Sequence, residues 1–203
     1  MKVIALTGEI GAGKSAAAKV LEALGGVRLD ADKIALSLWQ RKDIKDKAVT
    51  RWGKNILDDE FNIIFAEIAK IIFNSSEDYK FCCELLHPVV MQELAAKVNE
   101  LKAFNNYNFI VAEVPLLFEV DNKLWRSWVD YILFIAADKA VRFQRCRERG
   151  WDDGELSRRE SYYLPSFARK AHSDFIINND RDLEYLIQEL ADLLSKLNIK
   201  IKN

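Results

Sequence analysis

The 203-residue sequence is poor in cysteine. Cys82, Cys83 and Cys146 are an odd number of thiols and do not have the spacing of metal ligands. Neither a disulfide framework nor a cysteine metal site is therefore expected. We interpret the three residues as reduced thiols of an intracellular protein that fill its interior.

Long apolar runs and an excess of one charge are also absent. No run is long enough to span a bilayer, and the N-terminus lacks a charged, apolar, small-residue leader. The formal net charge of −1 gives no general attraction to nucleic acid or anionic lipid. We therefore expect a cytoplasmic protein, a monomer or small homo-oligomer, with no nucleic acid or membrane partner.

The chain also shows no internal repeat, linker or low-complexity tract. With 50% hydrophobic and 30% charged residues, it can bury a sizeable core in one domain with insertions.

The most informative stretch is a complete phosphate-binding loop, G-x-x-x-x-G-K-S, from Gly8 to Ser15. An apolar run at 3–6 predicts a buried strand before it, and residues 16–24 predict a helix after it. Glycines at three places allow amides to turn around a polyphosphate at the helix N-terminus. The residues expected to hold ATP in this way are Gly8, Gly11, Ala12, Gly13, Lys14, Ser15 and Ala16. Lys14 would reach the outer phosphates, and the Ser15 hydroxyl would bind Mg²⁺.

Two aspartates follow the next predicted strand, residues 27–29. Asp30 and Asp32 are expected at the sheet edge that carries the phosphate-binding loop, because ligands bind outside the carboxyl ends of parallel strands. On an extended chain, residues two apart point the same way. Asp32 could accept a hydroxyl proton or hold a metal-bound water, whereas one of the two aspartates could instead cap the helix near Lys33.

Residues 34–103 are predicted to be helical, without a strand pair. His87-Pro88 is expected to interrupt this region, with a new helix over 89–102, because proline is best tolerated at a helix start. His87 would then lie at a helix N-terminus. It could donate to an anionic or ribose oxygen there, or act only in capping or packing.

Three further strands are expected at 108–114, 131–135 and 173–177. Glu113 lies near the end of the first of these, where it could contact magnesium in the outer shell or only cap the turn. A helix over 183–197 with one apolar face should pack on the sheet.

A basic run lies between the last two strands. From Arg142 to Lys170 there are eight basic and five acidic residues, a local net charge of +3. Such a run is commonly a solvated helix face. Because it follows a sheet-edge loop and contains Gly150 and Gly154, we favour a mobile lid over the phosphates.

The alternation of strands and helices predicts an α/β fold, a doubly wound five-stranded parallel sheet of the P-loop nucleotide-kinase type. We expect one kinase domain over residues 1–203. Its core would comprise about 1–32, 105–140 and 173–203, with a helical acceptor-binding insertion at 33–104 and the lid at 141–172.

An ordered set of motifs through most of the chain resembles the dephospho-coenzyme A kinase family. The phosphate-binding loop alone is generic, and the His-Pro and Pro-Leu-Leu-Phe-Glu elements make the resemblance specific. The set comprises Leu6-Thr7-Gly8 into Gly13-Lys14-Ser15, Asp30-Ala31-Asp32, Trp52-Gly53, Leu86-His87-Pro88, Pro115-Leu116-Leu117-Phe118-Glu119, Arg145, Arg149, and Asp174-Phe175-Ile176-Ile177 leading to Asn179.

The resemblance implies transfer of the terminal phosphoryl group of ATP, with Mg²⁺, to the ribose 3′-hydroxyl of dephospho-coenzyme A, the last step of coenzyme A synthesis. It implies that Asp32 engages the acceptor hydroxyl and that Arg149 closes on ATP. Asn179 would form part of the adenine pocket. The implied contacts to dephospho-coenzyme A are His87, Pro115, Leu116, Leu117 and Glu119.

Five positions depart from the family pattern. Glu9 replaces the usual second glycine of the loop, and Ala16 replaces the usual threonine. Leu36 and Asn62 stand where arginines are usual, and Tyr163 stands near the usual lid glutamine. Two alternatives therefore stay open: a kinase for another small nucleotide or nucleoside, and a P-loop switch or motor ATPase.

Overall fold

A computed structural model describes residues 1–104, 106–119 and 123–202. The chain divides into two compact units. We call Met1–Ala31 with Leu94–Asn203 the core unit and Asp32–Glu93 the helical unit. The domain bounds predicted at 105 and 203 lie outside the described residues. The predicted partition into core, insertion and lid stays a prediction.

The core unit is built on a parallel sheet, which has five strands within the described residues. The strand order is β2-β3-β1-β4-β5. The strands are β1 Lys2–Gly8, β2 Gly26–Asp30, β3 Phe109–Glu113, β4 Tyr131–Ala136 and β5 Phe175–Asn178. This confirms the predicted doubly wound α/β fold.

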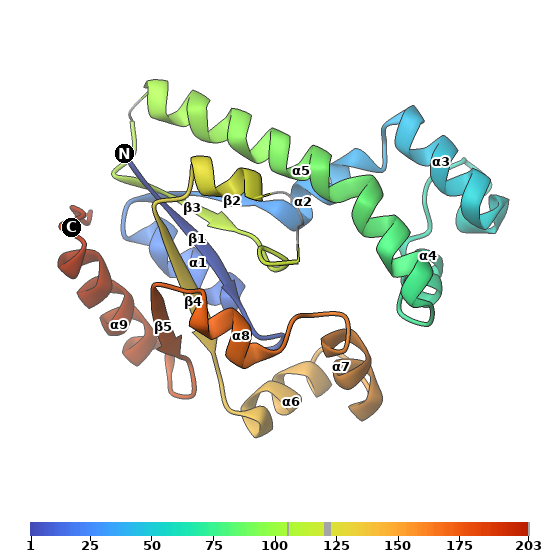
Figure 1. Ribbon diagram of the computed structural model, residues 1–203. Coiled ribbons are helices and arrows are strands. Elements are labelled where there is room, and N and C mark those ends of the chain that lie inside the picture. Colours follow the sequence, from blue (N-terminus) through green and yellow to red (C-terminus); the bar gives the residue numbers. More distant parts are fainter. Residues whose placement is uncertain (105, 120–122, 203) are drawn as a thin grey trace. The chain divides into compact units, whose positions relative to one another are not determined.

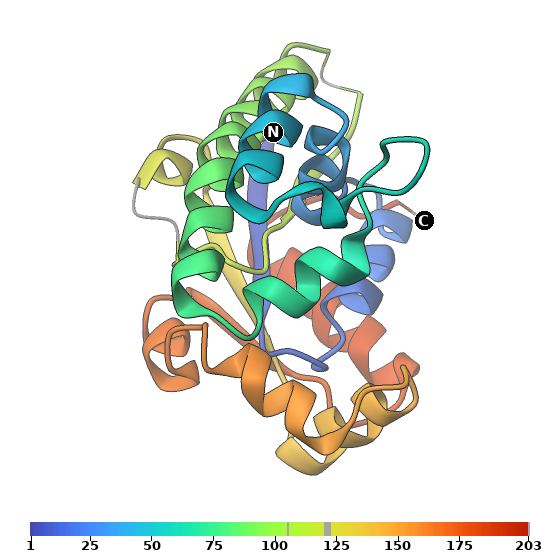
Figure 2. The same ribbon diagram turned by 90° about the vertical axis from the view of Figure 1, so that its right-hand side faces the viewer.

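Helices cover both faces of this sheet (Figures 1 and 2). One face is covered by α1 (Lys14–Ala23) and α9 (Leu183–Lys196). The other face is covered by the 94–104 part of α5, by the short helix η2 (Lys123–Ser127) and by α8 (Ser166–Ala171). Alternate residues of β1 are buried on opposite faces, so the strand is apolar throughout. The core under α1 and α9 includes Ile4, Leu6, Leu21, Val111, Leu133 and Leu190.

The basic segment between β4 and β5, residues 141–172, is called the lid segment below. It contains most of α6, Lys139–Arg147, then α7, Asp153–Glu160, and α8. Asp152 caps α7 by accepting the amides of Gly154 and Glu155 at 2.7 Å each. A small apolar cluster of Ile10, Cys146 and Leu156 packs this segment against the phosphate-binding loop.

The helical unit contains short helices followed by most of a long one. They are α2 Ala31–Leu38, α3 Lys42–Trp52, η1 Lys54–Ile56, α4 Phe65–Ile72 and α5 Ser76–Phe104. Trp52 packs on Trp39 and Phe81, with ring centroids 6.4 and 5.3 Å apart, and its indole N–H donates to Asp78. The predicted absence of a strand pair holds for the described residues, where Leu57 and Ile63 form only an isolated bridge.

The prediction that His87-Pro88 starts a new helix is wrong. Residues 76–104 form one continuous helix, α5, with Pro88 inside it. Pro88 cannot donate to the carbonyl of Glu84, and an interior proline costs about 3 kcal/mol. Buried apolar residues on both sides of the proline favour the unbroken helix, namely Leu85, Leu86, Val90, Met91 and Leu94.

Three further expectations need correction. Asp30 ends β2, but Asp32 lies in the first turn of α2, so the extended-chain argument for a common side does not apply. Of the predicted apolar face of α9, Leu183 and Ile187 are exposed. The region predicted to be helical at 34–103 is interrupted before α4, which begins at Phe65, and Phe61 in this interruption has a positive φ of 61°.

Cys82 and Cys146 are buried, as interpreted from the sequence, whereas Cys83 is only partly buried. Among the described helices, none is both long and apolar enough to cross a membrane.

Candidate active site

The phosphate-binding loop joins the buried strand β1 to α1 and depends on two glycines. Gly13 precedes the helix with φ 93°, and a Cβ there would lie 2.3 Å from Nδ2 of Asn179. Gly8 has φ 152°, and a Cβ would lie 2.2 Å from the carbonyl oxygen of Ile135. A side chain at Gly8 would displace the backbone of Ile135. One at Gly13 would displace the Asn179 side chain and would need a φ that residues other than glycine rarely adopt. The first amides of α1 have no carbonyl partner within the helix, so this terminus suits an anion.

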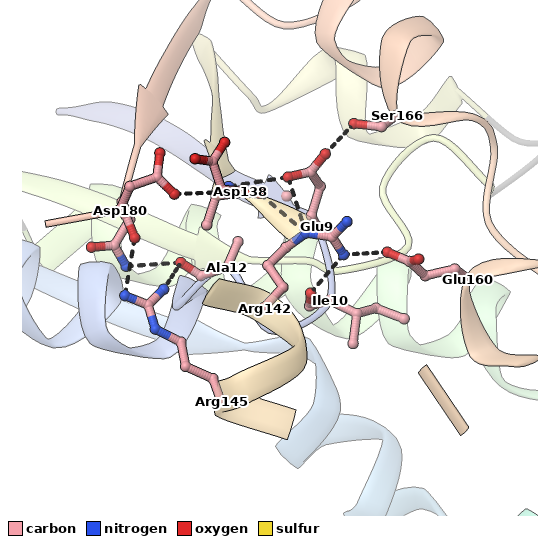
Figure 3. A network of polar contacts seen from close by, with 12 residues as sticks. Glu9, Ile10, Ala12, Asp138, Arg142, Arg145, Glu160, Ser166 and Asp180 are labelled. Atoms are coloured by element: carbon pink, nitrogen blue, oxygen red, sulfur yellow. Dashed lines mark hydrogen bonds and ion pairs between the residues drawn. The ribbon is translucent and has the colours of Figure 1, made fainter. Parts of the chain in front are cut away.

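Side chains from the lid segment and from the end of β5 hold the loop by its carbonyl groups. Arg145 donates to the carbonyl of Ala12 at 3.3 Å, and Asn179 donates to the same oxygen at 2.8 Å (Figure 3). The second guanidinium nitrogen of Arg145 donates to the Asn179 carbonyl at 3.0 Å. Ala12 is thus fixed from two elements that follow β4 and β5.

Two buried arginines make equivalent contacts nearer the start of the loop. Arg142 donates to the carbonyl of Ile10 at 3.2 Å, and Arg169 donates to the carbonyl of Gly8 at 3.0 Å. Only 7% of Arg142 and 3% of Arg169 is exposed, so neither side chain is a solvated surface charge. Buried guanidinium groups that bind carbonyl oxygens fix the course of the loop backbone.

Lys14 lies against the loop that it follows. Its ammonium donates to the carbonyl of Glu9 at 2.9 Å and to that of Gly8 at 3.3 Å. A lysine ammonium is a compact charge on a flexible stem, so the same group can move onto a phosphate oxygen.

A carboxylate completes the site at the edge of the sheet. In the parallel register Glu113 lies opposite Asp30 of β2 and Leu6 of β1, so it belongs to the carboxyl edge that carries the loop. The Ser15 hydroxyl donates to one oxygen of Glu113 at 2.8 Å, and Arg28 forms an ion pair with the other. Arg28 also pairs with Asp30 at 2.9 Å.

This oxygen pair fits a magnesium ion. Mg²⁺ takes oxygen ligands and is commonly held by one or two protein groups together with substrate phosphates. The Ser15 hydroxyl is one such group, and Glu113, which is 4% exposed, accepts its hydrogen bond and so lies beside it in the outer shell. In the described part of the chain, no cluster of three or more His, Cys, Asp or Glu could hold a metal alone. The arrangement therefore suits an ion whose remaining ligands come with the nucleotide and water.

The segment after β3 lies beside β1 and the lid segment. The Thr7 hydroxyl donates to the carbonyl of Pro115 at 3.1 Å, and Leu117 is fully buried. One oxygen of Glu119 accepts the amide of Leu164 at 3.0 Å, and the other is buried without a hydrogen-bond partner among the described residues. Burial raises the pKa of the Glu119 carboxyl, with the Leu164 amide and Arg169 opposing the shift.

The structure brings many of the predicted residues together within the core unit. The loop, Ser15, Glu113 and Asn179 are connected by the contacts above, whereas Arg149 is exposed just after the end of α6. Asp32 and His87 belong to the helical unit. His87 lies within α5 rather than at a helix start, and burial lowers its pKa. The roles predicted for all these residues stay predictions.

The sequence analysis did not single out Arg142 and Arg169 as loop contacts. Both belong to a run of basic residues that also includes exposed ones, such as Arg147, Arg149 and Arg158, and periodicity does not distinguish the two buried arginines. The environment of Glu9 was also missed, although its departure from the family pattern was a usable signal. The ion pair between Arg28 and Glu113 was not predicted from the sequence either.

Comparisons with known proteins agree on one family. The family model described as dephospho-CoA kinase matches residues 2–184. A dephospho-CoA kinase of Helicobacter pylori is 32% identical over 195 residues, covering 96% of both chains. One of Streptococcus agalactiae is 30% identical over 198 residues, covering 97% of this chain and 99% of the relative.

Solved structures extend the similarity to the fold. The crystal structure of TT1252 from Thermus thermophilus covers 97% of both chains with 27% identity and a TM-score of 0.74. The family match spans the loop, the Glu113 strand and the lid segment alike. The chain therefore belongs to the dephospho-CoA kinase family.

Proposed function

We propose that this protein transfers the terminal phosphoryl group of ATP to the ribose 3′-hydroxyl of dephospho-coenzyme A, which yields coenzyme A and ADP. The observation that carries the proposal is the Ser15–Glu113 pair beside the phosphate-binding loop, in a chain that matches the dephospho-CoA kinase family from residue 2 to 184. The relatives named above carry that activity in their names.

On the ATP side, the loop amides and Lys14 bind the phosphates. Phosphoryl transfer passes through a loose transition state, so positioning and charge neutralisation account for most of the catalysis. Lys14 then neutralises charge that develops on the transferred group. Ser15 would hold Mg²⁺, with Glu113 as an outer-shell contact. The ion would supply positive charge that neutralises the phosphate oxygens.

On the acceptor side, Asp32 accepts the proton of the attacking hydroxyl. A carboxylate in that role orients the oxygen for in-line attack. His87, Pro115, Leu116, Leu117 and Glu119 contact dephospho-coenzyme A. Because burial lowers the pKa of His87, the neutral imidazole is the favoured form, and it offers one N–H donor and one acceptor to the substrate.

The lid segment closes over the nucleotide. Its exposed Arg149 approaches the phosphates only on closure, whereas Arg142, Arg145 and Arg169 already bind the loop backbone. Asn179 lines the adenine pocket. We also propose that the protein acts in the cytoplasm as a monomer or small homo-oligomer and binds no nucleic acid.

A coupled ADP-release assay over a panel of acceptors tests the function. Dephospho-coenzyme A should give turnover well above adenosine, pyrimidine nucleotides and water, and mass spectrometry should identify coenzyme A as the product. Better use of another acceptor would support a different small-molecule kinase. Slow hydrolysis independent of every acceptor would support a switch ATPase.

A further inference from the structure

Glu9 places a negative charge inside the phosphate-binding loop, where it would repel a polyphosphate if it faced the ligand. The side chain is instead buried, with 6% of the residue exposed. The contacts of its carboxylate lie toward the start of α6 and toward α8 (Figure 3).

Each carboxylate oxygen binds a different part of the chain beyond β4. One accepts the amide of Ala137, just before α6, at 3.1 Å. The other accepts the hydroxyl of Ser166, the first residue of α8, at 2.5 Å. A single side chain thus joins the loop to both ends of the segment that contains α6, α7 and α8.

Two cations balance the buried charge. Arg142 of α6 lies 3.6 Å from one carboxylate oxygen, and Lys170 of α8 lies 3.5 Å from the other. Arg142 also pairs with Glu160 of α7 and binds the carbonyl of Ile10, so the contacts extend through all three helices (Figure 3). Burial raises the pKa of Glu9, but Ser166, Ala137, Arg142 and Lys170 together lower it below its ordinary value. The carboxylate is therefore charged at neutral pH.

We propose that Glu9 is a positioning residue that fixes the phosphate-binding loop to the two ends of the lid segment and so preorganises the loop for ATP. The inference rests on the proposed lid and adds to it a connection that a glycine at this position cannot make. Without the carboxylate, the loop keeps its arginine and Asn179 contacts but loses those to Ala137 and Ser166, so part of its ordering is left to ATP binding and is subtracted from the binding free energy.

Three variants distinguish the contributions of the hydrogen bonds of Glu9 from that of its charge. Glu9→Gly removes both hydrogen bonds and the charge. Glu9→Gln keeps the length, so its amide can accept from Ala137 and donate to Ser166, but it leaves Arg142 and Lys170 without their counter-charge. Ser166→Ala removes one hydrogen bond from the opposite side. Glu22→Gln, an exposed glutamate of α1, is the matched control.

The first measurement compares the KM for ATP with kcat in each variant. The KM for ATP should rise on the order of tenfold in Glu9→Gly and less in Glu9→Gln and Ser166→Ala, with kcat within about threefold, because loop ordering affects binding more than chemistry. The double variant Glu9→Gln/Ser166→Ala should deviate from additivity, since the two side chains are in contact. Glu22→Gln should match the wild type.

The second measurement is amide hydrogen exchange without nucleotide. Exchange should accelerate in residues 137–147 and 164–171 as well as in the loop, whereas a purely local role of Glu9 would affect only the loop and α1. The proposal is overturned if Glu9→Gly keeps the wild-type exchange in both lid regions and its ATP affinity is within twofold. If Glu9→Gly does not fold, the same criteria apply to Ser166→Ala and Glu9→Gln.

Binding of a non-hydrolysable ATP analogue, measured by calorimetry, keeps this test separate from the proposed function. A wild type that binds the analogue but does not phosphorylate dephospho-coenzyme A would overturn the function. The comparison of Glu9 variants with wild type would still decide the role of Glu9.

Discussion

At the scale of single residues, Lys14 contributes the charge of the phosphate site. Its ammonium already lies among the loop carbonyls, so truncation leaves the anchored backbone in place and removes one cation. We expect Lys14→Ala to fold and to lose turnover by about a hundredfold to a thousandfold, a loss typical of removing one transition-state donor. Steady-state kinetics and circular dichroism check this. Lys19→Ala, on the exposed side of α1, should behave as wild type, and near-normal turnover of Lys14→Ala would contradict the site.

The two aspartates after Leu29 differ in environment, which separates their expected roles. Asp30 is paired with Arg28 in the core unit, whereas Asp32 opens α2. Asp32→Asn keeps the shape but removes the basicity, so turnover should fall roughly a hundredfold or more while ATP binding persists. ADP release and calorimetry measure the two effects. If Asp30→Asn alone lost turnover and Asp32→Asn did not, the assigned roles would be reversed.

At the scale of elements, α2 contains Leu36, one of the positions that differ from the family pattern, and this difference should weaken binding of the acceptor. Leu36 is 50% exposed at a position where the family resemblance leads us to expect arginine. Asn62 stands at the second such position, and its amide donates to Asp58 within a turn. A charge-assisted hydrogen bond contributes about 1.5 to 3 kcal/mol. Leu36→Arg should therefore lower the KM for dephospho-coenzyme A roughly tenfold or more, and that for ATP much less.

The matched control is Leu124→Arg, because Leu124 is an exposed leucine of η2 with a similar exposed fraction, 46%. It should leave both Michaelis constants unchanged. If Leu36→Arg had no larger effect than Leu124→Arg, the acceptor would bind elsewhere. An acceptor panel that favours another substrate would show instead that the departures mark a changed specificity.

The free energy of unfolding should depend on pH through His87 in helix α5. Burial lowers the pKa of this imidazole below its ordinary value of 6.5, so between the two values the unfolded state binds more protons. The free energy of unfolding should therefore fall as pH drops below about 6.5, by at most about 1.4 kcal/mol per pH unit. Urea unfolding followed by tryptophan fluorescence at pH 7.5 and 5.5 measures the fall.

Carboxylates also begin to titrate near pH 5.5, so the wild type alone does not isolate the effect of His87. The contribution of His87 is the difference in stability loss between the wild type and His87→Gln. His87→Gln should lose less stability over this interval than the wild type, whereas His172→Gln, at an exposed position, should lose as much. Equal losses in wild type and His87→Gln would mean that the imidazole is not held in its neutral form.

At the scale of the whole molecule, the sheet and the loop depend on local patterns, and the sequence determined them. Apolar runs predicted the central strands β3, β1 and β4, because a strand buried on both faces must be apolar throughout. Shorter stretches predicted the edge strands β2 and β5, which are only partly buried. The spacing of glycines, Lys14 and Ser15 predicted a phosphate site, since it reflects backbone geometry within one turn. The motif set also indicated the family that the comparisons then showed.

Contacts between residues far apart in the sequence were not predictable from local patterns. Pro88 stays inside α5, because burial along the helix outweighs the local preference for a break. Arg142 and Arg169 are buried on loop carbonyls, although they resemble their exposed neighbours in sequence. Glu9 is bonded to Ser166, 157 positions away. Such pairings depend on how β4, α6 and α8 pack around the loop, and no pattern of neighbouring residues contains that information.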